Sequence, residues 1–255
     1  MGPRSEGTCI NTRKALGACL SRAAGKPARP VRGTGRLSGV SFDPYQPYGP
    51  VVPGSSRVVS WNVWGRFGDW VARQDGLIFE LKAVYPDIIC LQESWETEGE
   101  RQADVVGDGL GLNHRFAAAD WSWEGWRSGA AVLAAFVAEV QSRRYLTVVC
   151  GDFNAGPDSD EIRLLNGRSQ PPVDGLVFYD AWEIAGDGGP GFTWANSNPL
   201  AGVAMLPDRR IDYIFTAWPR RGSLGHPLNC RLLGANPLDD LDISDHYGIY
   251  ADLRY

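Results

Sequence analysis

The chain has 255 residues, of which 44% are hydrophobic and 22% are charged, and its formal net charge is −5. A chain of this length forms one large domain or two small ones and has ample apolar material for a core. The apolar and charged fractions lie near globular averages, which excludes wholesale disorder. No apolar run approaches the roughly 18 residues that are needed to cross a bilayer, so we expect no integral membrane association.

Positive charge is concentrated at the start of the chain. Residues 1–57 hold nine Lys and Arg residues against two acidic ones and carry a net charge of +7, whereas residues 58–255 carry −12. The segment is rich in Gly and Pro and cannot bury enough apolar surface to offset chain entropy. We therefore expect residues 1–56 to be a disordered basic tail and residues 57–255 to form the folded domain. A nucleic-acid-binding arm or a transit peptide is the alternative for the tail.

A strand–helix–strand unit opens the folded part of the chain. Residues 57–65 are rich in β-branched and aromatic side chains, which is typical of a strand. Asp69 can cap the helix that follows, and Pro86 stops it. Residues 87–92 then form a short buried strand. This order of elements predicts that the two strands are parallel and that their carboxyl ends share one edge of a sheet.

The remaining elements alternate between short helices and short strands. Helices are predicted over residues 100–110 and 130–143, and a third buried strand covers residues 145–150. Asp158-x-x-Glu161 resembles a capping box at the start of another short helix. The C-terminal third is predicted to hold short strands near residues 192–195, 210–216, 230–233 and 247–253.

The cysteines are Cys9, Cys19, Cys90, Cys150 and Cys230. An odd number without a Cys-x-x-Cys spacing argues against a disulfide framework and against a zinc site. Cys90 and Cys150 lie within apolar, strand-like runs, where we expect buried free thiols. A reducing compartment fits this usage best, and we expect a cytoplasmic protein.

Polar side chains gather where the predicted strands end. They are Asn62, Glu93, Asp152, Asn154, Asp212, Asp245 and His246. Taken singly, such residues are more often turn residues or helix caps. Together, the carboxylates, amides and single histidine indicate a hard-cation site beside a general base. Oxygen ligands without cysteine favour Mg²⁺ or Mn²⁺ over zinc.

Tryptophans lie close to two of these segments. The pairs Trp61/Trp64 and Trp121/Trp123 could contact a ligand. Large aromatic side chains are more often part of a core, however. We therefore interpret both pairs as core residues.

Five short motifs follow one another in a characteristic order. They are Ser60-Trp-Asn62-Val, Leu91-Gln92-Glu93, Gly151-Asp152-Phe-Asn154, Arg210-Ile-Asp212-Tyr-Ile-Phe and Ser244-Asp245-His246. Together they resemble the endonuclease/exonuclease/phosphatase superfamily, which includes pancreatic deoxyribonuclease, apurinic-site endonucleases, inositol-polyphosphate 5-phosphatases and neutral sphingomyelinases. The resemblance covers residues 57–255. It implies a four-layer α/β sandwich of two packed mixed β-sheets flanked by helices, with a divalent-metal phosphoesterase site at one end.

The resemblance also implies a set of metal ligands. Glu93 would be the principal ligand, with Asn62 beside it and Asp245 near the same ion or a second one. An ion held there would bind a non-bridging phosphate oxygen and offset the charge that builds up during the reaction.

The catalytic residues implied by the resemblance are His246, Asp212, Asp152 and Asn154. His246 would be the general base or a phosphate contact, and Asp212 would accept from its ring N–H and favour the imidazolium. Asp152 and Asn154 would position the attacking water and donate to the phosphate. In-line attack by water would break the P–O bond without a covalent intermediate.

The chain departs from the family between Glu93 and Asp152. Complete members carry a central hairpin with a second catalytic histidine there, but here only 58 residues separate the two positions. The one histidine in the interval, His114, lies too early and in a different local context to replace it. The resemblance therefore implies a sandwich that is shortened in the middle.

These observations predict a divalent-metal-dependent hydrolase of phosphodiesters or phosphomonoesters that is impaired by an internal deletion. The alternative is a non-catalytic relic or binding module that keeps the metal ligands without turnover. The charge of −12 on residues 58–255 offers no basic track for duplex DNA. The substrate therefore stays open among nucleic acid, sugar phosphate and lipid headgroup, and we expect a monomer.

Overall fold

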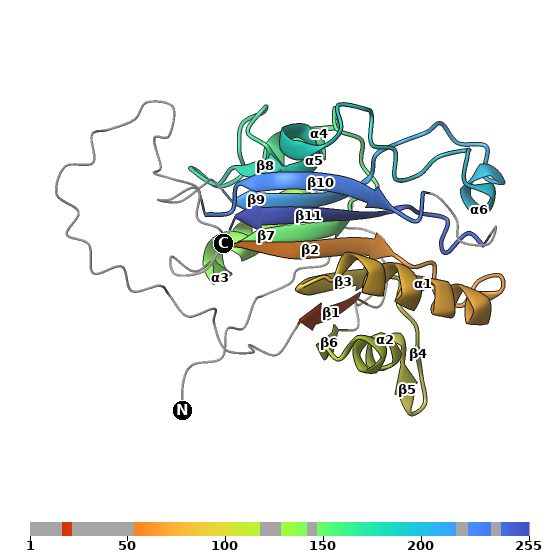
Figure 1. Ribbon diagram of the computed structural model, residues 1–255. Helices are drawn as coiled ribbons and strands as arrows, with labels where there is room; N and C mark the ends of the chain where they lie inside the picture. The colour runs from red at the N-terminus through yellow and green to blue at the C-terminus, as the bar shows by residue number, and fades with distance from the viewer. Residues whose placement is uncertain are drawn as a thin grey trace, which may run out of the picture.

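The computed structural model describes residues 17–21, 54–117, 129–141, 147–217, 224–235 and 241–254. Two sheets pack against each other in it (Figure 1). In spatial order, the larger sheet consists of β10 (Pro227–Leu233), β11 (Gly248–Arg254), β2 (Ser55–Asn62), β3 (Ile88–Gln92), β1 (Gly17–Ser21) and β6 (Asn113–Ala117). The smaller sheet consists of β7 (Val148–Asp152), β9 (Asp212–Ala217) and β8 (Phe178–Asp180). A separate two-stranded ribbon is formed by β4 (Glu96–Thr97) and β5 (Glu100–Arg101).

Six short to medium helices accompany the two sheets in the described part of the chain. They are α1 (Trp70–Val84), α2 (Gln102–Leu110), α3 (Gly129–Val140), α4 (Asp160–Leu165), α5 (Ala181–Ala185) and α6 (Pro199–Gly202). Side chains of α1 and α2 pack on one face of the larger sheet, and those of α3 and α4 pack on the smaller sheet. The α/β sandwich expected from the sequence is therefore confirmed. No helix within the described ranges has the length and apolar character of a membrane span.

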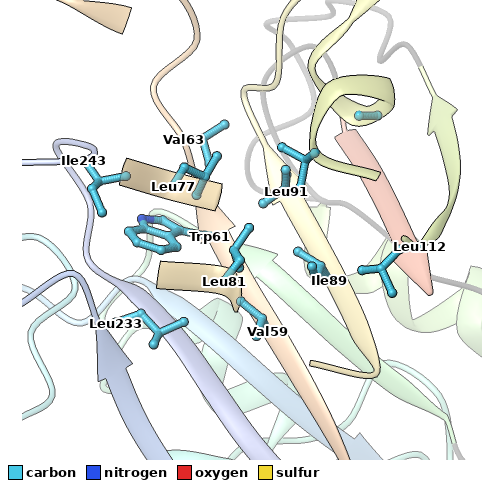
Figure 2. Close-up of a cluster of buried hydrophobic side chains, with 12 residues drawn as sticks. Val59, Trp61, Val63, Leu77, Leu81, Ile89, Leu91, Leu112, Leu233 and Ile243 are labelled. Carbon is cyan, nitrogen blue, oxygen red and sulfur yellow. The ribbon is translucent and has the colours of Figure 1, made fainter. Parts of the chain in front are cut away.

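The alternation of side chains along β2 and β3 builds two cores at once. Val59 and Trp61 face α1, where they meet Leu77 and Leu81 (Figure 2). Val58, one residue earlier on β2, faces the other way and joins the cluster between the two sheets. Successive residues of a strand point to opposite faces, so one apolar run supplies both layers.

The first strand–helix–strand unit forms as the sequence predicts. β2 and β3 are parallel, with Asn62 opposite Gln92. The Asp69 side chain accepts from the N–H of Ala72 at 3.3 Å and caps α1. The helix ends at a left-handed Tyr85, directly before Pro86.

Two local predictions are wrong. The short helix α4 is capped by Ser159, whose hydroxyl accepts from the N–H of Ile162 at 3.4 Å, and not by Asp158. Residues 192–195 form no strand, because only Trp194 pairs there, in an isolated bridge to Arg209. Capping geometry depends on which residue adopts the extended backbone, and the spacing of the motif does not decide it.

Residues 17–21 correct the expectation of a wholly disordered tail. They form β1, which runs antiparallel to both β3 and β6 and lies between them (Figure 1). Cys19 lies opposite Cys90 in the register of β1 and β3. Cys90 is disulfide-bonded, so the expectation of a free thiol is wrong at that position, whereas Cys230 is a buried free cysteine. The rest of the tail up to residue 53 lies outside the described residues.

Candidate active site

A cavity of about 280 Å³ opens at the end of the sandwich where polar side chains follow the strands. Five of the seven residues predicted for the site line it: Glu93, Asp152, Asn154, Asp245 and His246. The other two, Asn62 and Asp212, lie behind this lining and are hydrogen-bonded to Asp152 and His246. The structure therefore brings all seven residues together.

Strand geometry explains this convergence. β2 and β3 are parallel, so Asn62 at the end of one and Glu93 just after the other share an edge of the larger sheet. In the smaller sheet β7 and β9 are antiparallel, and Asp152 at the end of β7 lies opposite Asp212 at the start of β9. Each sheet therefore presents its polar strand ends at the same end of the sandwich.

A histidine–carboxylate pair forms the deepest part of the site. His246 Nδ1 lies 2.9 Å from Asp212 Oδ2, and the two side chains are 5% and 0% exposed. The hydroxyl of Thr193 accepts from the backbone N–H of Asp212 at 3.1 Å and fixes the start of β9. Burial lowers the pKa of His246, but the carboxylates of Asp212, Asp152 and Asp245 outweigh it and raise the pKa to about 10. The ring is therefore an imidazolium at neutral pH.

Asp152 is held by three hydrogen bonds. The backbone N–H and the side-chain amide of Asn154 each donate to it at 2.8 Å, and the amide of Asn62 donates at 3.2 Å. Burial and the charge of Asp212 raise the pKa of Asp152 to about 6, against the lowering effect of His246 and these donors. A carboxylate with this pKa can accept a proton near neutral pH.

Glu93 and Asp245 form the more open side of the cavity. Burial and, to a smaller extent, the charge of Glu93 raise the pKa of Asp245 to about 6, against the lowering effect of His246. Glu93 has a left-handed backbone with φ +53°, as do its cavity neighbours Trp64 (φ +54°) and Asn154 (φ +50°). Such conformations are costly for residues with a side chain and cluster at functional sites.

Two sets of donors could hold a divalent cation. One is Glu93 with Asp245, whose like charges face the same cavity. The other is Asp152, Asp212 and His246, whose ligand atoms lie within 4.8 Å of one another. We favour the first set because His246 Nδ1 is already bound to Asp212, whereas no described residue donates a hydrogen bond to the Glu93 carboxylate. Carboxylate oxygens of this kind fit Mg²⁺ or Mn²⁺.

Apolar and basic residues that were not predicted for the site complete the cavity. They are Trp64, Phe67, Trp194, Leu206 and Arg209. The interpretation of Trp61 and Trp64 as core residues is right for Trp61, which is fully buried, and wrong for Trp64. Trp64 follows the end of β2 and turns toward the cavity, whereas Trp61 lies within the strand. Trp121 and Trp123 lie outside the described residues.

His246 is the only one of the three histidines that lines the cavity. His114 lies on β6, and its Nε2 contacts Asp104 of α2 at 2.8 Å. This position agrees with the interpretation that His114 does not replace a second catalytic histidine.

The sequence matches the Endonuclease/Exonuclease/phosphatase family over residues 59–246. The chain belongs to this family. The family includes metal-dependent phosphoesterases and nucleases. No curated protein sequence matches the chain.

Solved structures show the same fold. TDP2 of D. rerio, complexed with a single-strand DNA product, aligns with a TM-score of 0.60 and 16% identity over 79% of this chain and 99% of that chain. An endonuclease/exonuclease/phosphatase from Bacteroides vulgatus aligns with a TM-score of 0.56 and 15% identity, over 78% of this chain and 98% of that chain. An AP endonuclease from Archaeoglobus fulgidus aligns with a TM-score of 0.55 and 14% identity, over 78% of this chain and 100% of that chain. At these identities the likeness establishes the fold alone.

Proposed function

We propose that the protein is a divalent-metal-dependent phosphoesterase that hydrolyses phosphate esters by in-line attack of water. The observation that carries the proposal is the buried pair of His246 and Asp212, 2.9 Å apart, beside a cavity lined by carboxylates. A hydrogen-bonded histidine and an acidic cluster in one cavity are the groups that such chemistry needs.

His246 and Asp152 would carry out the proton transfers. With a pKa of about 10, His246 donates its remaining ring N–H to a phosphate oxygen and stabilises the charge that develops there. Asp152, with a pKa of about 6, accepts a proton from the attacking water. Asp212 keeps the ring oriented, and Asn154 and Asn62 keep the Asp152 carboxylate in place.

Glu93 and Asp245 would hold the cation, with Asn62 beside them. A bound Mg²⁺ or Mn²⁺ supplies electrostatic stabilisation of the phosphate oxygens. The amide oxygen of Asn62 already accepts from the N–H of Trp64 at 3.1 Å, which leaves it one further lone pair for a ligand.

A non-catalytic relic of the same fold is the less favoured alternative. All seven predicted residues converge on one cavity, and the hydrogen bonds that orient Asp152 and His246 are present. A binding module would have no need for this orientation. The expected weakness of the activity remains part of the proposal, because one positioned acid or base typically contributes about 10²–10⁴ in rate.

A nucleic acid strand is the first substrate to test. The D. rerio TDP2 structure contains a single-strand DNA product, and the Archaeoglobus fulgidus protein is an AP endonuclease. The cavity is also flanked by Trp64 and Phe67, whose rings lie 5.6 Å apart, and Phe67 is 61% exposed. Exposed aromatic rings are typical stacking partners of unpaired bases.

The test is hydrolysis of bis-p-nitrophenyl phosphate and of a single-stranded oligonucleotide with Mg²⁺ or Mn²⁺. We expect turnover that is lost with chelator and in His246→Ala. His114→Ala is the matched control, because it removes a histidine that also contacts a carboxylate but lies outside the cavity. Metal-dependent turnover that survives in His246→Ala would contradict the assignment, and a wild type without any turnover would favour the relic.

A further inference from the structure

Arg209 stands out among the residues that line the cavity. It precedes the motif that contains Asp212 and is anchored through its backbone. Its N–H donates to the carbonyl of Trp194 at 2.8 Å, and its carbonyl accepts from the N–H of Trp194 at 2.9 Å. The backbone is therefore fixed, and the half-buried side chain extends along the cavity wall.

The guanidinium of Arg209 has no anionic partner within the part of the chain that the structure describes. Its Nε is buried and has no hydrogen-bond partner among those residues. The Nε of the neighbouring Arg210 is also buried without a partner, but its guanidinium forms an ion pair with the buried carboxylate of Asp180, whereas that of Arg209 forms none with a described residue. A buried donor without a partner costs free energy. Because Arg209 also lines the cavity, a ligand there could satisfy its guanidinium.

Trp194 brings Arg209 next to the histidine of the site. The ring of Trp194 packs edge-on against His246 with 5.0 Å between centroids. The guanidinium carbon of Arg209 lies 6.0 Å from the centroid of the same ring. That distance is at the outer limit of a cation–π contact, so the contact with Trp194 does not satisfy the cation.

The charges around the cavity favour an anion at this position. Arg209 and His246 are the cationic side chains among the lining residues, and Glu93, Asp152 and Asp245 are the anionic ones. Arg209 forms no ion pair with any of these carboxylates. A guanidinium presents a planar fork of donors that matches two oxygens of a phosphate.

We propose that Arg209 is a substrate-binding residue whose guanidinium donates to the non-bridging oxygens of a phosphate group in the cavity. This inference rests on the proposed function and adds a second cationic contact beside His246. It assigns a role to Arg209, which directly precedes one of the five sequence motifs but is not part of it. The ligand class is a phosphate monoester or diester, with inorganic phosphate as its simplest member.

Inorganic phosphate binding tests the inference without any need for turnover. We would titrate phosphate into the wild type, Arg209→Ala and Arg209→Lys by calorimetry at a fixed Mg²⁺ concentration. We expect the dissociation constant to rise by about 10- to 100-fold in Arg209→Ala, which loses a charged hydrogen bond. The rise should be smaller in Arg209→Lys, which keeps the charge without the fork.

Arg66→Ala is the matched control. The guanidinium of Arg66 also lies over tryptophan rings, 4.4 Å from Trp70 and 4.3 Å from Trp95, but it does not line the cavity. We expect its phosphate dissociation constant to stay within twofold of the wild type. Thermal melts of all variants check that they fold. If Arg209→Ala does not fold, the phosphate affinity of Arg209→Lys still tests the inference.

The possible outcomes separate this inference from the proposed function. Equal phosphate affinity in the wild type and Arg209→Ala overturns the inference, even if metal-dependent hydrolysis is observed. A wild type that binds no phosphate overturns it as well. Weakened phosphate binding in Arg209→Ala together with a wild type that hydrolyses no ester supports the inference and contradicts the proposed function.

Discussion

The two sheets contribute to the site in different ways. The smaller sheet supplies Asp152 and Asp212, which are 3% and 0% exposed and are held by hydrogen bonds. The larger sheet supplies Asn62 and Glu93 at the ends of parallel strands. One hydrogen bond crosses between these residues, from the side-chain amide of Asn62 to Asp152 at 3.2 Å. The smaller sheet thus supplies the two most tightly held carboxylates, while Glu93 on the larger sheet faces the cavity without a hydrogen bond from any described residue.

The largest effect on activity is expected from Asp212→Asn, which changes the residue of the smaller sheet that orients His246. The carboxylate that raises the pKa of His246 and fixes its ring would be lost. We expect the rate of ester hydrolysis to fall by about 10²–10⁴, the contribution usual for one positioned acid or base. Steady-state kinetics with Mn²⁺ measure it. A rate within a factor of three of the wild type would show that the smaller sheet does not orient the histidine.

The pH profile of hydrolysis tests whether Asp212 keeps His246 protonated. His246 must stay protonated, so the rate should fall by about tenfold per unit as the pH rises past about 10. In Asp212→Asn this fall should begin at lower pH, because a principal source of the raised pKa is gone. The pKa of His246 in the folded protein lies above its ordinary value of 6.5. Protonation of the ring therefore stabilises the fold fully below pH 6.5, and this stabilisation is lost as the pH rises toward 10. A basic limb that does not move in the variant would contradict this assignment.

The larger sheet depends on β1, which a truncation can remove. Deleting residues 1–53 leaves β3 and β6 without the strand between them. Several backbone hydrogen bonds of about 1 kcal/mol each are lost, so we expect unfolding free energy to fall by about 3 kcal/mol. Urea unfolding measures this change. Deletion of residues 1–16, which keeps β1, is the control, and equal stability of the two truncations would contradict the pairing of β1.

Metal addition tests the more open side of the site. Glu93 and Asp245 repel each other when no cation is bound. A metal that binds only the folded protein should stabilise it by about 2.7 kcal/mol at a hundredfold excess over its dissociation constant. We expect Glu93→Gln to lose most of this gain in thermal melts, whereas Glu96→Gln, which changes an exposed carboxylate paired with Arg101, keeps it. A wild type that Mg²⁺ and Mn²⁺ leave unchanged would contradict the metal site.

The smallest change in stability is expected for the ion pair of Arg57 and Asp252, on strands β2 and β11 of the larger sheet. Arg57 on β2 donates to both carboxylate oxygens of Asp252 on β11, at 2.6 and 2.8 Å, and these bonds outweigh burial and lower the pKa of Asp252. Arg57→Lys cannot keep the two parallel bonds, so we expect a loss of about 1 kcal/mol at neutral pH. The difference should shrink in acid, as Asp252 becomes protonated, and ester hydrolysis should be unchanged. Denaturant unfolding at several pH values checks both expectations.

The sequence leads us to expect the seven candidate residues near one another because they lie close to strand ends. Asn62, Glu93 and Asp152 each end or follow an apolar run, and parallel pairing of the first two strands is enough to expect Asn62 and Glu93 at one edge of a sheet. The fold class follows from the same motifs. It is expected from the family resemblance of these motifs, whose order along the chain places them at neighbouring strand ends.

Other features depend on partners that lie far along the chain. β1 is a five-residue strand in a basic segment rich in Gly and Pro, and only its pairing with β3 and β6 reveals it. Arg209 and Arg210 are adjacent and chemically identical, yet Arg210 binds Asp180 and Arg209 faces the cavity. No local pattern distinguishes two such residues, because the difference arises from the surrounding tertiary structure.

The position of β1 also has a consequence for the order in which the protein can assemble. During synthesis β1 is made first, but both of its neighbours, β3 and β6, are made much later. The strand therefore has no partner until the ribosome has passed residue 92, and its second edge stays unpaired until residue 117. Pairing over such a long separation closes a large loop and slows folding. Until then its unpaired edges are open to other chains, so the yield of native protein should depend on how quickly the segment between residues 88 and 117 becomes available.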